Sequence, residues 1–240
     1  MPYSLFKAVH NWRQSVLHLF YPDLCVSCNA ALPSSKGQCF CFRCRSRLTH
    51  TDFHLHQENA VTERLWGRVH LHSATSLYYF SKKSPVQWAL HHLKYSNQPD
   101  IGRRLGRVLG RQMAQSPWFE DIEAIVPVPL HPQKERRRGY NQSLMIAQGI
   151  SDAMYLPVLD QVLMRNRHTI SQTQQHRMER FQNVGSVFSL NHSHHIQGKK
   201  LLLVDDVLTT GATIETCGNL LLGVPGVRLS VATIAVAMRH

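Results

Sequence analysis

The chain has 240 residues, of which 43% are hydrophobic and 18% are charged, a globular composition that excludes a largely disordered protein. It carries 27 Lys and Arg against 15 Asp and Glu, and the resulting net charge of +12 predicts anionic partners such as phosphorylated molecules or nucleic acid. The aliphatic stretch at residues 201–204 is too short to cross a bilayer, and the N-terminal residues lack the order of a signal peptide. We therefore expect a cytoplasmic protein without stable membrane insertion.

The first third of the chain alternates patterned and polar segments. Apolar residues at three- and four-residue steps predict an amphipathic helix over residues 1–20, and a cysteine-rich module follows at residues 21–50. Residues 51–74 are polar and rich in histidine, and we expect them to form a linker. A strand-like run, ATSLYYF at residues 74–80, then opens a domain that we expect to span residues 75–240.

Helices and strands alternate through the rest of the chain. Periodic apolar residues predict helices, and apolar runs bounded by turn residues predict strands. The expected helices cover residues 84–95, 101–115, 140–154 and 212–223, the expected strands cover residues 123–130, 156–163, 200–204 and 227–238, and loops are expected at residues 131–139 and 164–183. This alternation predicts an α/β fold, in which a parallel sheet is covered by helices on both faces.

Five of the six cysteines lie in one short segment. Two Cys-x2-Cys pairs, Cys25 with Cys28 and Cys41 with Cys44, can supply the four thiolates of a tetrahedral zinc site. A zinc-ribbon module of this size cannot bury enough apolar surface to fold alone, so a structural zinc ion would hold it together. Three alternatives stay open: the cysteines are merely buried, Cys39 replaces Cys41 with a poorer spacing, or a nearby histidine joins the site.

The segment LLLVDDVLTTGAT, residues 201–213, places two carboxylates after an apolar strand and a Thr- and Gly-rich loop before a helix. Loop amides and threonine hydroxyls at such a helix start can bind a phosphate. Because two adjacent carboxylates repel a bare phosphate, the ligand must also offer ribose hydroxyls or a bound Mg²⁺ ion. A sugar-phosphate site is therefore expected, with a purely structural strand end as the alternative. The candidate residues are Asp205, Asp206, Thr209, Thr210, Gly211, Ala212 and Thr213.

This segment resembles the phosphoribosyl-pyrophosphate (PRPP) motif of type I phosphoribosyltransferases. Together with the upstream string PVPLHPQKERRRGYNQS, it makes the chain similar to the ComF/GntX family of competence-associated and DNA-utilisation proteins. The resemblance covers nearly the whole chain, from LFYPDLC near the start through HHLKYSNQPDIGRRLG to VDDVLTTGAT. It implies a type I phosphoribosyltransferase-like sheet with helices on both faces, preceded by the small zinc-ribbon module.

The resemblance also implies roles for particular residues. Asp205 and Asp206 would contact the ribose hydroxyls and Mg²⁺, and residues 209–213 would hold the 5′-phosphate. The basic loop after the VPVP strand would approach the pyrophosphate, because arginine binds phosphate oxygens in bidentate fashion. A solvated basic loop is the alternative. The candidate residues of the loop are Lys134, Arg136, Arg137, Arg138 and Gly139.

A second basic region precedes the loop. Arg103, Arg107 and Arg111 lie four residues apart, so a helix would present them as one cationic stripe, with Lys94 upstream. Cations among aromatic residues suit single-stranded DNA, whose bases stack on rings. The alternative is an ordinary solvated helix face.

Three functions fit these patterns. The chain could transfer phosphoribose from PRPP, with Mg²⁺, to an unknown acceptor. It could instead sense PRPP or a related sugar phosphate while its basic surface binds single-stranded DNA, or it could be a regulator with neither activity. The resemblance implies a role in the uptake or utilisation of external DNA, with DNA-uptake machinery proteins as partners.

Overall fold

The computed structural model describes residues 23–32, 37–166 and 187–238. The helix expected at residues 1–20 lies outside the described residues, as does most of the loop expected at residues 164–183. Within the described ranges, no helix has the length and apolar character needed to cross a membrane.

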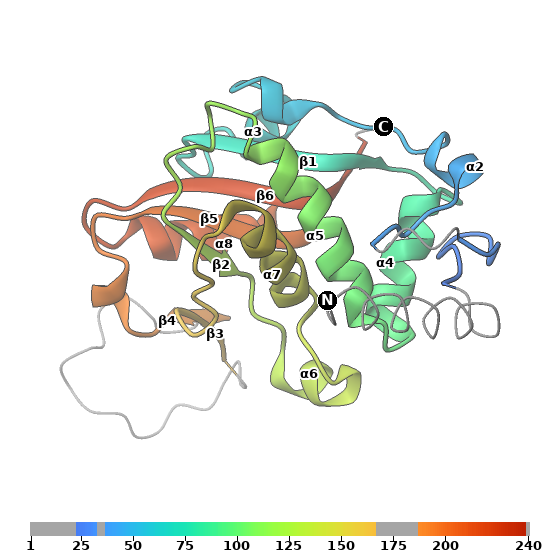
Figure 1. Cartoon of the computed structure of the whole chain (residues 1–240). Helices are drawn as coiled ribbons and strands as arrows, with labels where there is room; N and C mark the ends of the chain where they lie inside the picture. The colour runs from blue at the N-terminus through green and yellow to red at the C-terminus, as the bar shows by residue number, and fades with distance from the viewer. Residues whose placement is uncertain (1–22, 33–36, 167–186, 239–240) are drawn as a thin grey trace, which may run out of the picture.

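A four-stranded parallel sheet forms the centre of the molecule (Figure 1). Its strand order is β1 (Ser73–Phe80), β6 (Arg228–Ala237), β5 (Lys200–Leu208) and β2 (Ala124–Pro127), and each neighbouring pair is parallel. The inner strands are buried along nearly their whole length, which explains why their sequences are apolar runs rather than alternating patterns. The predicted α/β fold with a parallel sheet is confirmed.

Helices cover both faces of the sheet. On one face lie α4 (Pro85–Tyr95), α5 (Pro99–Met113) and α7 (Gln142–Met154), and on the other lie α3 (Ala60–Leu65) and α8 (Ala212–Leu222). In Figure 1, α5 and α7 cross in front of the sheet and α8 lies behind it. Successive side chains of β5 point to opposite faces, so Leu202 joins the core under α5 and α7 while Leu203 joins the core under α3 and α8.

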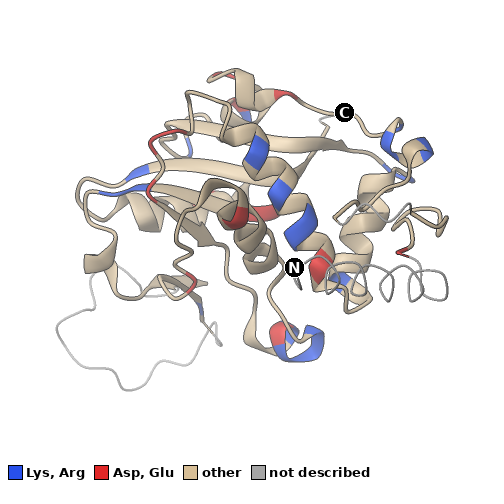
Figure 2. Ribbon diagram, viewed as in Figure 1, with Lys and Arg blue, Asp and Glu red and all other residues tan. Residues whose placement is uncertain are grey.

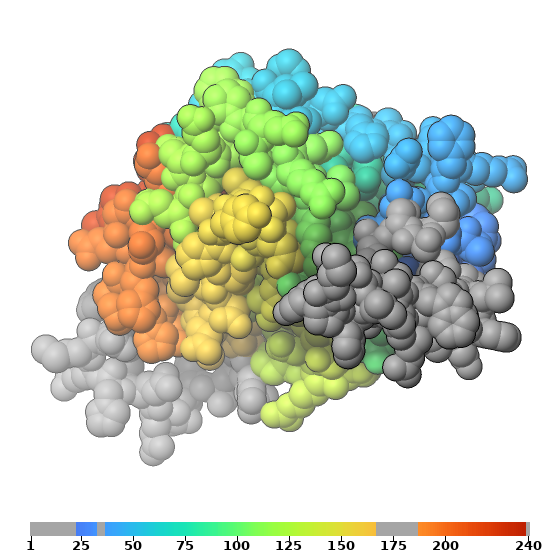
Figure 3. All heavy atoms as spheres, viewed as in Figure 1, coloured from blue at the N-terminus to red at the C-terminus, as the bar shows by residue number. Residues whose placement is uncertain are grey.

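The helices α5 and α7 pack against each other through glycine, and their surfaces adjoin in Figure 3. A Cβ atom on Gly106 would lie 2.2 Å from the carbonyl oxygen of Ile146, and one on Gly149 would lie 2.1 Å from that of Arg103. No side chain fits at either position, because real Cβ atoms do not approach backbone atoms so closely. The two backbones therefore lie in direct contact. The four-residue spacing of the glycines on α5 is the sequence signal for this packing.

The prediction of a loop at residues 131–139 is wrong, because most of these residues form the helix α6 (Pro132–Arg138). Pro132 occupies the first helical position, where its missing N–H costs nothing, and the ring of His131 accepts a hydrogen bond from the first turn. Gly139 then ends the helix with a φ of 84°. The charged residues between these helix start and stop signals led to the prediction of a solvated loop.

The strand expected at residues 156–163 is also largely wrong. Only a single bridge joins Val158 to Ile125 of β2. The strand β3 (Leu163–Arg165) begins where the expected strand ends, and it pairs with β4 (Phe188–Leu190) in a separate antiparallel sheet. The 3-10 helix η2 (Ser193–His195) follows β4. An apolar run identifies a buried segment but not the strand that pairs with it, which accounts for the difference.

Residues 51–74, expected as a linker, fold against the sheet instead. They form the 3-10 helix η1 (Phe53–Leu55) and α3, and β1 already begins within this segment. Asn59 begins α3 with a capping box, and its side-chain amide also donates to the Ala74 carbonyl of β1 at 2.9 Å. Polar residues such as Asn59 thus cap a helix and bind the sheet, so the polarity of the segment does not by itself indicate a linker.

Candidate functional site

The two predicted carboxylates lie inside β5, not after its end as expected. Asp205 pairs in register with Thr233 of β6, and β5 continues to Leu208. Both carboxylates are buried, with Asp205 only 9% exposed and Asp206 only 5% exposed. The strand extends beyond the apolar run because β6 pairs with it up to Leu208, a contact that the local sequence does not reveal.

Each carboxylate has a partner from a distant part of the chain. The hydroxyl of Ser143, in the first turn of α7, donates to Oδ1 of Asp205 at 2.9 Å. The ammonium of Lys94, in the last turn of α4, lies 2.8 Å from Oδ2 of Asp206. Burial and, next, the neighbouring charge of Asp206 raise the pKa of Asp205 to about 7, although the Asp206 amide, the Ser143 hydroxyl and Lys94 act in the opposite direction. Near neutral pH, Asp205 is therefore partly protonated.

The Thr- and Gly-rich loop connects β5 to α8. Thr209 and Thr210 are exposed, and Gly211 stands at the start of α8 with a φ of 85°. A Cβ atom at Gly211 would approach a Leu65 methyl group to 2.9 Å, so the glycine is required for both backbone angle and space. The first amides of α8 have no partner within the helix, and they can meet an anion together with the loop hydroxyls. Ala212 and Thr213 form this first turn.

Two arginines from the segment expected as a linker hold this loop. Arg64 is 8% exposed, and its guanidinium donates to the carbonyl of Thr209 at 3.0 Å. Arg68 donates to the carbonyl of Thr210 at 2.6 Å and forms an ion pair with Glu215 of α8. Sequence reasoning missed both arginines, because nothing in their spacing connects them to a loop more than 140 residues away.

The end of α6 lies beside the end of α4. The guanidinium of Arg138 stands 6.0 Å from the ring centroid of Tyr95, next to Lys94, and Arg138 also donates to the side chain of Gln142. Arg137 is exposed, and Gly139 ends α6 as described above. The structure therefore brings Arg138 near the carboxylate region, while Arg137 has no recorded contact with the other site residues among those described.

The arginine stripe on α5 is partly neutralised. The Nε atoms of Arg103 and Arg107 lie 2.7 and 2.8 Å from the same oxygen of Asp152, on α7. Arg111 is exposed at the far end of the stripe. Lys94, assigned with these arginines to nucleic acid, is instead an ion-pair partner of Asp206. Its position in the sequence could not show this, because the partner lies on another element.

The four predicted zinc-binding thiols come together around the short helix α2 (Phe42–Arg45). The Sγ atoms of Cys25, Cys28, Cys41 and Cys44 all lie within 4.8 Å of one another, and those of Cys28 and Cys41 are 3.6 Å apart. Tetrahedral zinc–thiolate bonds place sulfur atoms about 3.8 Å apart, so the set can hold a zinc ion. Cys39 is buried outside this set, and burial raises the pKa of its thiol to about 12.

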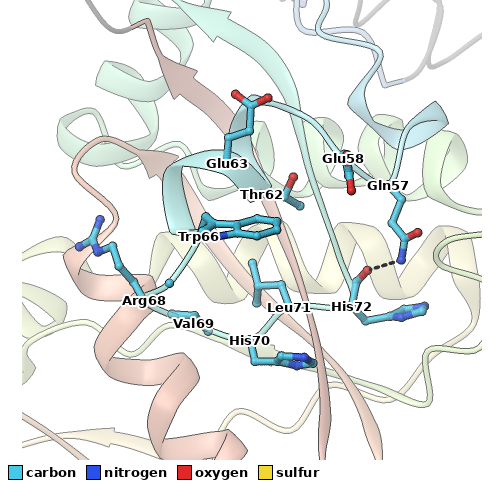
Figure 4. A pocket seen from close by; sticks show the side chains of 11 residues that line it. Gln57, Glu58, Thr62, Glu63, Trp66, Arg68, Val69, His70, Leu71 and His72 are labelled. Carbon is cyan, nitrogen blue, oxygen red and sulfur yellow. Dashed lines mark hydrogen bonds between the residues drawn. The ribbon is translucent and has the colours of Figure 1, made fainter.

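A separate hollow of about 570 Å³ is formed by residues 57–72. Figure 4 shows the indole of Trp66 above Leu71, and the side chain of Gln57 donating to the carbonyl of His72. Arg68 points away from these side chains, in keeping with its bonds to the loop before α8. Neither the carboxylates nor the loop residues line this hollow, so its size does not identify the functional site.

Comparisons with known proteins agree with the fold. Residues 141–240 match the phosphoribosyl transferase domain family. Competence protein F of Haemophilus influenzae is 30% identical over 226 residues, which cover 92% of this chain and 93% of that protein. DNA utilization protein YhgH of Escherichia coli K12 is 30% identical over 141 residues, 58% of this chain and 61% of that protein. Competence protein ComFC of Bacillus subtilis is 29% identical over 98 residues, 41% and 38% of the two chains.

Among solved structures, the glutamine PRPP amidotransferase of B. subtilis aligns with a TM-score of 0.41 at 20% identity, over 60% of this chain and 30% of that one. The end-to-end relationship to Competence protein F and the matched domain family together decide the classification. This chain belongs to the ComF family and carries a phosphoribosyltransferase domain.

Proposed function

We propose that this chain binds PRPP with Mg²⁺ at the carboxylates and loop of β5, and that it serves the uptake or utilisation of external DNA as a phosphoribosyltransferase. The observation that carries the proposal is the convergence of a buried Asp pair, the Thr- and Gly-rich loop before α8, and the basic residue Lys94 at the C-terminal half of β5. The relatives named for competence and DNA utilisation support the cellular role.

Each part of the site matches one part of PRPP. The amides and hydroxyls at residues 209–213 would hold the 5′-phosphate, and the carbonyl contacts of Arg64 and Arg68 would keep the loop in shape for it. Asp205 and Asp206 would accept hydrogen bonds from the ribose hydroxyls and attract Mg²⁺. Ligand binding would also release Lys94 from Asp206, which would leave its ammonium free to meet phosphate oxygens.

In the proposed reaction, the bond from C1 of the ribose to pyrophosphate breaks and an acceptor atom bonds to C1. The protein would hold the ribose in place while cations stabilise the charge on the departing pyrophosphate. Arg138 is the described α6 arginine nearest this role, since it lies against Tyr95 beside Lys94. Arg137 and Lys134 would contribute from the exposed side of α6.

The test is calorimetric titration of zinc-loaded protein with PRPP and Mg²⁺. The double variant Asp205→Asn, Asp206→Asn should weaken binding by at least about tenfold, because it removes the charges that attract the cation and accept from the ribose. Asp160→Asn makes the same chemical change at an exposed carboxylate and should leave binding unchanged. Equal affinity in the double variant and the wild-type protein would refute the site. Release of pyrophosphate with bases or DNA fragments then tests for transfer.

Single-stranded DNA binding without transfer is the second candidate, and the exposed rings of α4 favour it. The ring centroids of Trp88 and His91 are 6.3 Å apart, and those of His91 and Tyr95 are 4.9 Å apart. The guanidinium of Arg138 lies over the Tyr95 ring. Trp88 is 47% exposed and Tyr95 is 65% exposed. Such a row of rings beside cations suits unpaired bases.

Replacing Trp88 and Tyr95 with Ala should weaken single-stranded DNA binding by about 1–3 kcal/mol per lost stacking contact. The triple variant Arg103→Ala, Arg107→Ala, Arg111→Ala should reduce the salt dependence of DNA binding. The reduction should be smaller than that expected from the loss of three unpaired cations, because Asp152 already neutralises part of the stripe. Fluorescence anisotropy at several salt concentrations measures both effects. DNA affinity that survives the loss of both rings would argue against this surface.

A further inference from the structure

A groove of about 400 Å³ lies between the cysteine segment and α5, and neither Asp205 nor Asp206 lines it. Four guanidinium groups line it: Arg45 of α2 on one side, and Arg104, Arg107 and Arg111 of α5 on the other. Figure 2 shows basic residues along the length of α5 and a second group of basic residues at α2. No acidic residue belongs to the described lining, so the groove concentrates positive charge.

The carboxylates nearest these arginines do not line the groove. Arg104 is held by Asp100 at 2.8 Å, and it donates to the carbonyl of Gln38 at 3.1 Å, which ties the cysteine segment to α5. Arg107 forms an ion pair with Asp152, which also pairs with Arg103 one turn earlier on α5. Within the described part of the chain, Arg45 and Arg111 have no recorded carboxylate partner within 4 Å, so their full charge faces the groove and the solvent.

The rest of the lining is aromatic and apolar. The His50 and Tyr78 rings meet edge to face with centroids 4.8 Å apart, with His50 exposed and Tyr78 buried. The thiol of Cys39 adds a neutral group to the lining. A ligand here would therefore meet guanidinium groups along α5 and a ring surface on the opposite side.

We propose that this groove binds a nucleoside monophosphate, with its phosphate on the α5 arginines and its base against His50. Arginine pairs with phosphate oxygens through two parallel hydrogen bonds, and an anion would also offset the charges of Arg45 and Arg111, which have no recorded carboxylate partner among the described residues. The base supplies the flat aromatic face that His50 and Tyr78 can pack against. A volume of about 400 Å³ lies within the range of small-molecule sites, so the proposal commits to a single nucleotide. The site is independent of the PRPP site proposed above.

The experiment titrates zinc-loaded, full-length protein with dAMP and compares two pairs of substitutions. Arg45→Gln with Arg111→Gln removes the two groove arginines that have no recorded carboxylate partner, so folding should be little affected. We expect this pair to weaken dAMP binding at least about tenfold while PRPP affinity is kept. The matched control, Arg43→Gln with Arg47→Gln, removes the same charge from exposed residues that do not line the groove, and it should bind dAMP normally.

The variant Asp205→Asn, Asp206→Asn separates this proposal from the proposed function. It should lose PRPP and retain dAMP binding that still depends on Arg45 and Arg111. Absence of PRPP binding in every protein, with arginine-dependent dAMP binding intact, would refute the PRPP site alone. Three results would overturn the groove: no dAMP binding, equal losses in both arginine pairs, or arginine-dependent binding of an oligonucleotide but not of dAMP.

Discussion

The cysteine cluster and the carboxylate site are assembled in different ways. All four thiols come from one segment of twenty residues, and two turns bring their sulfur atoms within 4.8 Å of one another. The carboxylate site draws Lys94 from α4, Ser143 from α7 and Arg64 from α3 to a single strand. Short spacing is visible in a sequence, whereas partners on separate elements are visible only once the elements have packed.

The comparison also suggests different sources of stability. We expect the cysteine segment to depend on a zinc ion, because its few buried residues, such as Leu32 and Phe40, lie at the edge of the larger core under α5. The carboxylate site relies on helix packing, because α7 delivers Ser143 only while its glycine contact with α5 persists. Each dependence can be broken separately.

The largest expected effect is the loss of zinc. Structural zinc binds zinc-finger peptides with an apparent free energy of about 10–16 kcal/mol, so Cys28→Ser should unfold residues 23–32 and 37–48 and leave them open to protease. PRPP binding should persist, because no cysteine contributes to the carboxylate site. Metal analysis and limited proteolysis measure the two outcomes. Cys39→Ala is the control and should keep its zinc. Zinc retained in full by Cys28→Ser would contradict the ligand set.

The next effect concerns the contact between α5 and α7. Gly106→Ala should lower the free energy of unfolding by about 3 kcal/mol, at the upper end of the range for overpacking, because the new methyl group would meet the Ile146 carbonyl. It should also weaken PRPP binding by displacing Ser143. Gly223→Ala is a fair control, since its Cβ would lie 3.3 Å from its nearest neighbour. Urea unfolding measures the free energy of unfolding of the two variants. Equal stability of Gly106→Ala and Gly223→Ala would disprove the close contact.

The smallest effect is the pH dependence of the Asp152 cluster. Hydrogen bonds from Arg103, then Arg107, lower the pKa of Asp152 to about 2 against partial desolvation. The unfolded value is about 3.9, so the folded state gains stability above that pH and loses it as the pH falls toward 2. Asp152→Asn should therefore cost less than about 1 kcal/mol at pH 7, because the cluster is partly exposed, and progressively less as the pH falls through 2. A difference that grew on acidification would refute the pairing.

Much of the fold was predictable from local patterns. The apolar runs at β1, β2, β5 and β6 identified the sheet, and the periodic segments identified α4, α5, α7 and α8. The errors fall where a local pattern had more than one structural outcome. The charge run of α6 suggested a loop although Pro132 and Gly139 mark its ends, and the polar residues before β1 suggested a linker although Asn59 and Arg64 anchor them to the sheet.

The sequence by itself determined the family, the alternation of strands and helices, the four clustered thiols and the Asp-Asp segment, because each depends on residues that are neighbours along the chain. Only the tertiary structure decided that Lys94 neutralises Asp206 and that Asp152 neutralises part of the arginine stripe. It also decided that Arg64 and Arg68 hold the loop before α8. An ion pair depends on a distance of a few ångströms, and separation along the chain does not specify that distance when helices from different parts of the sequence pack together.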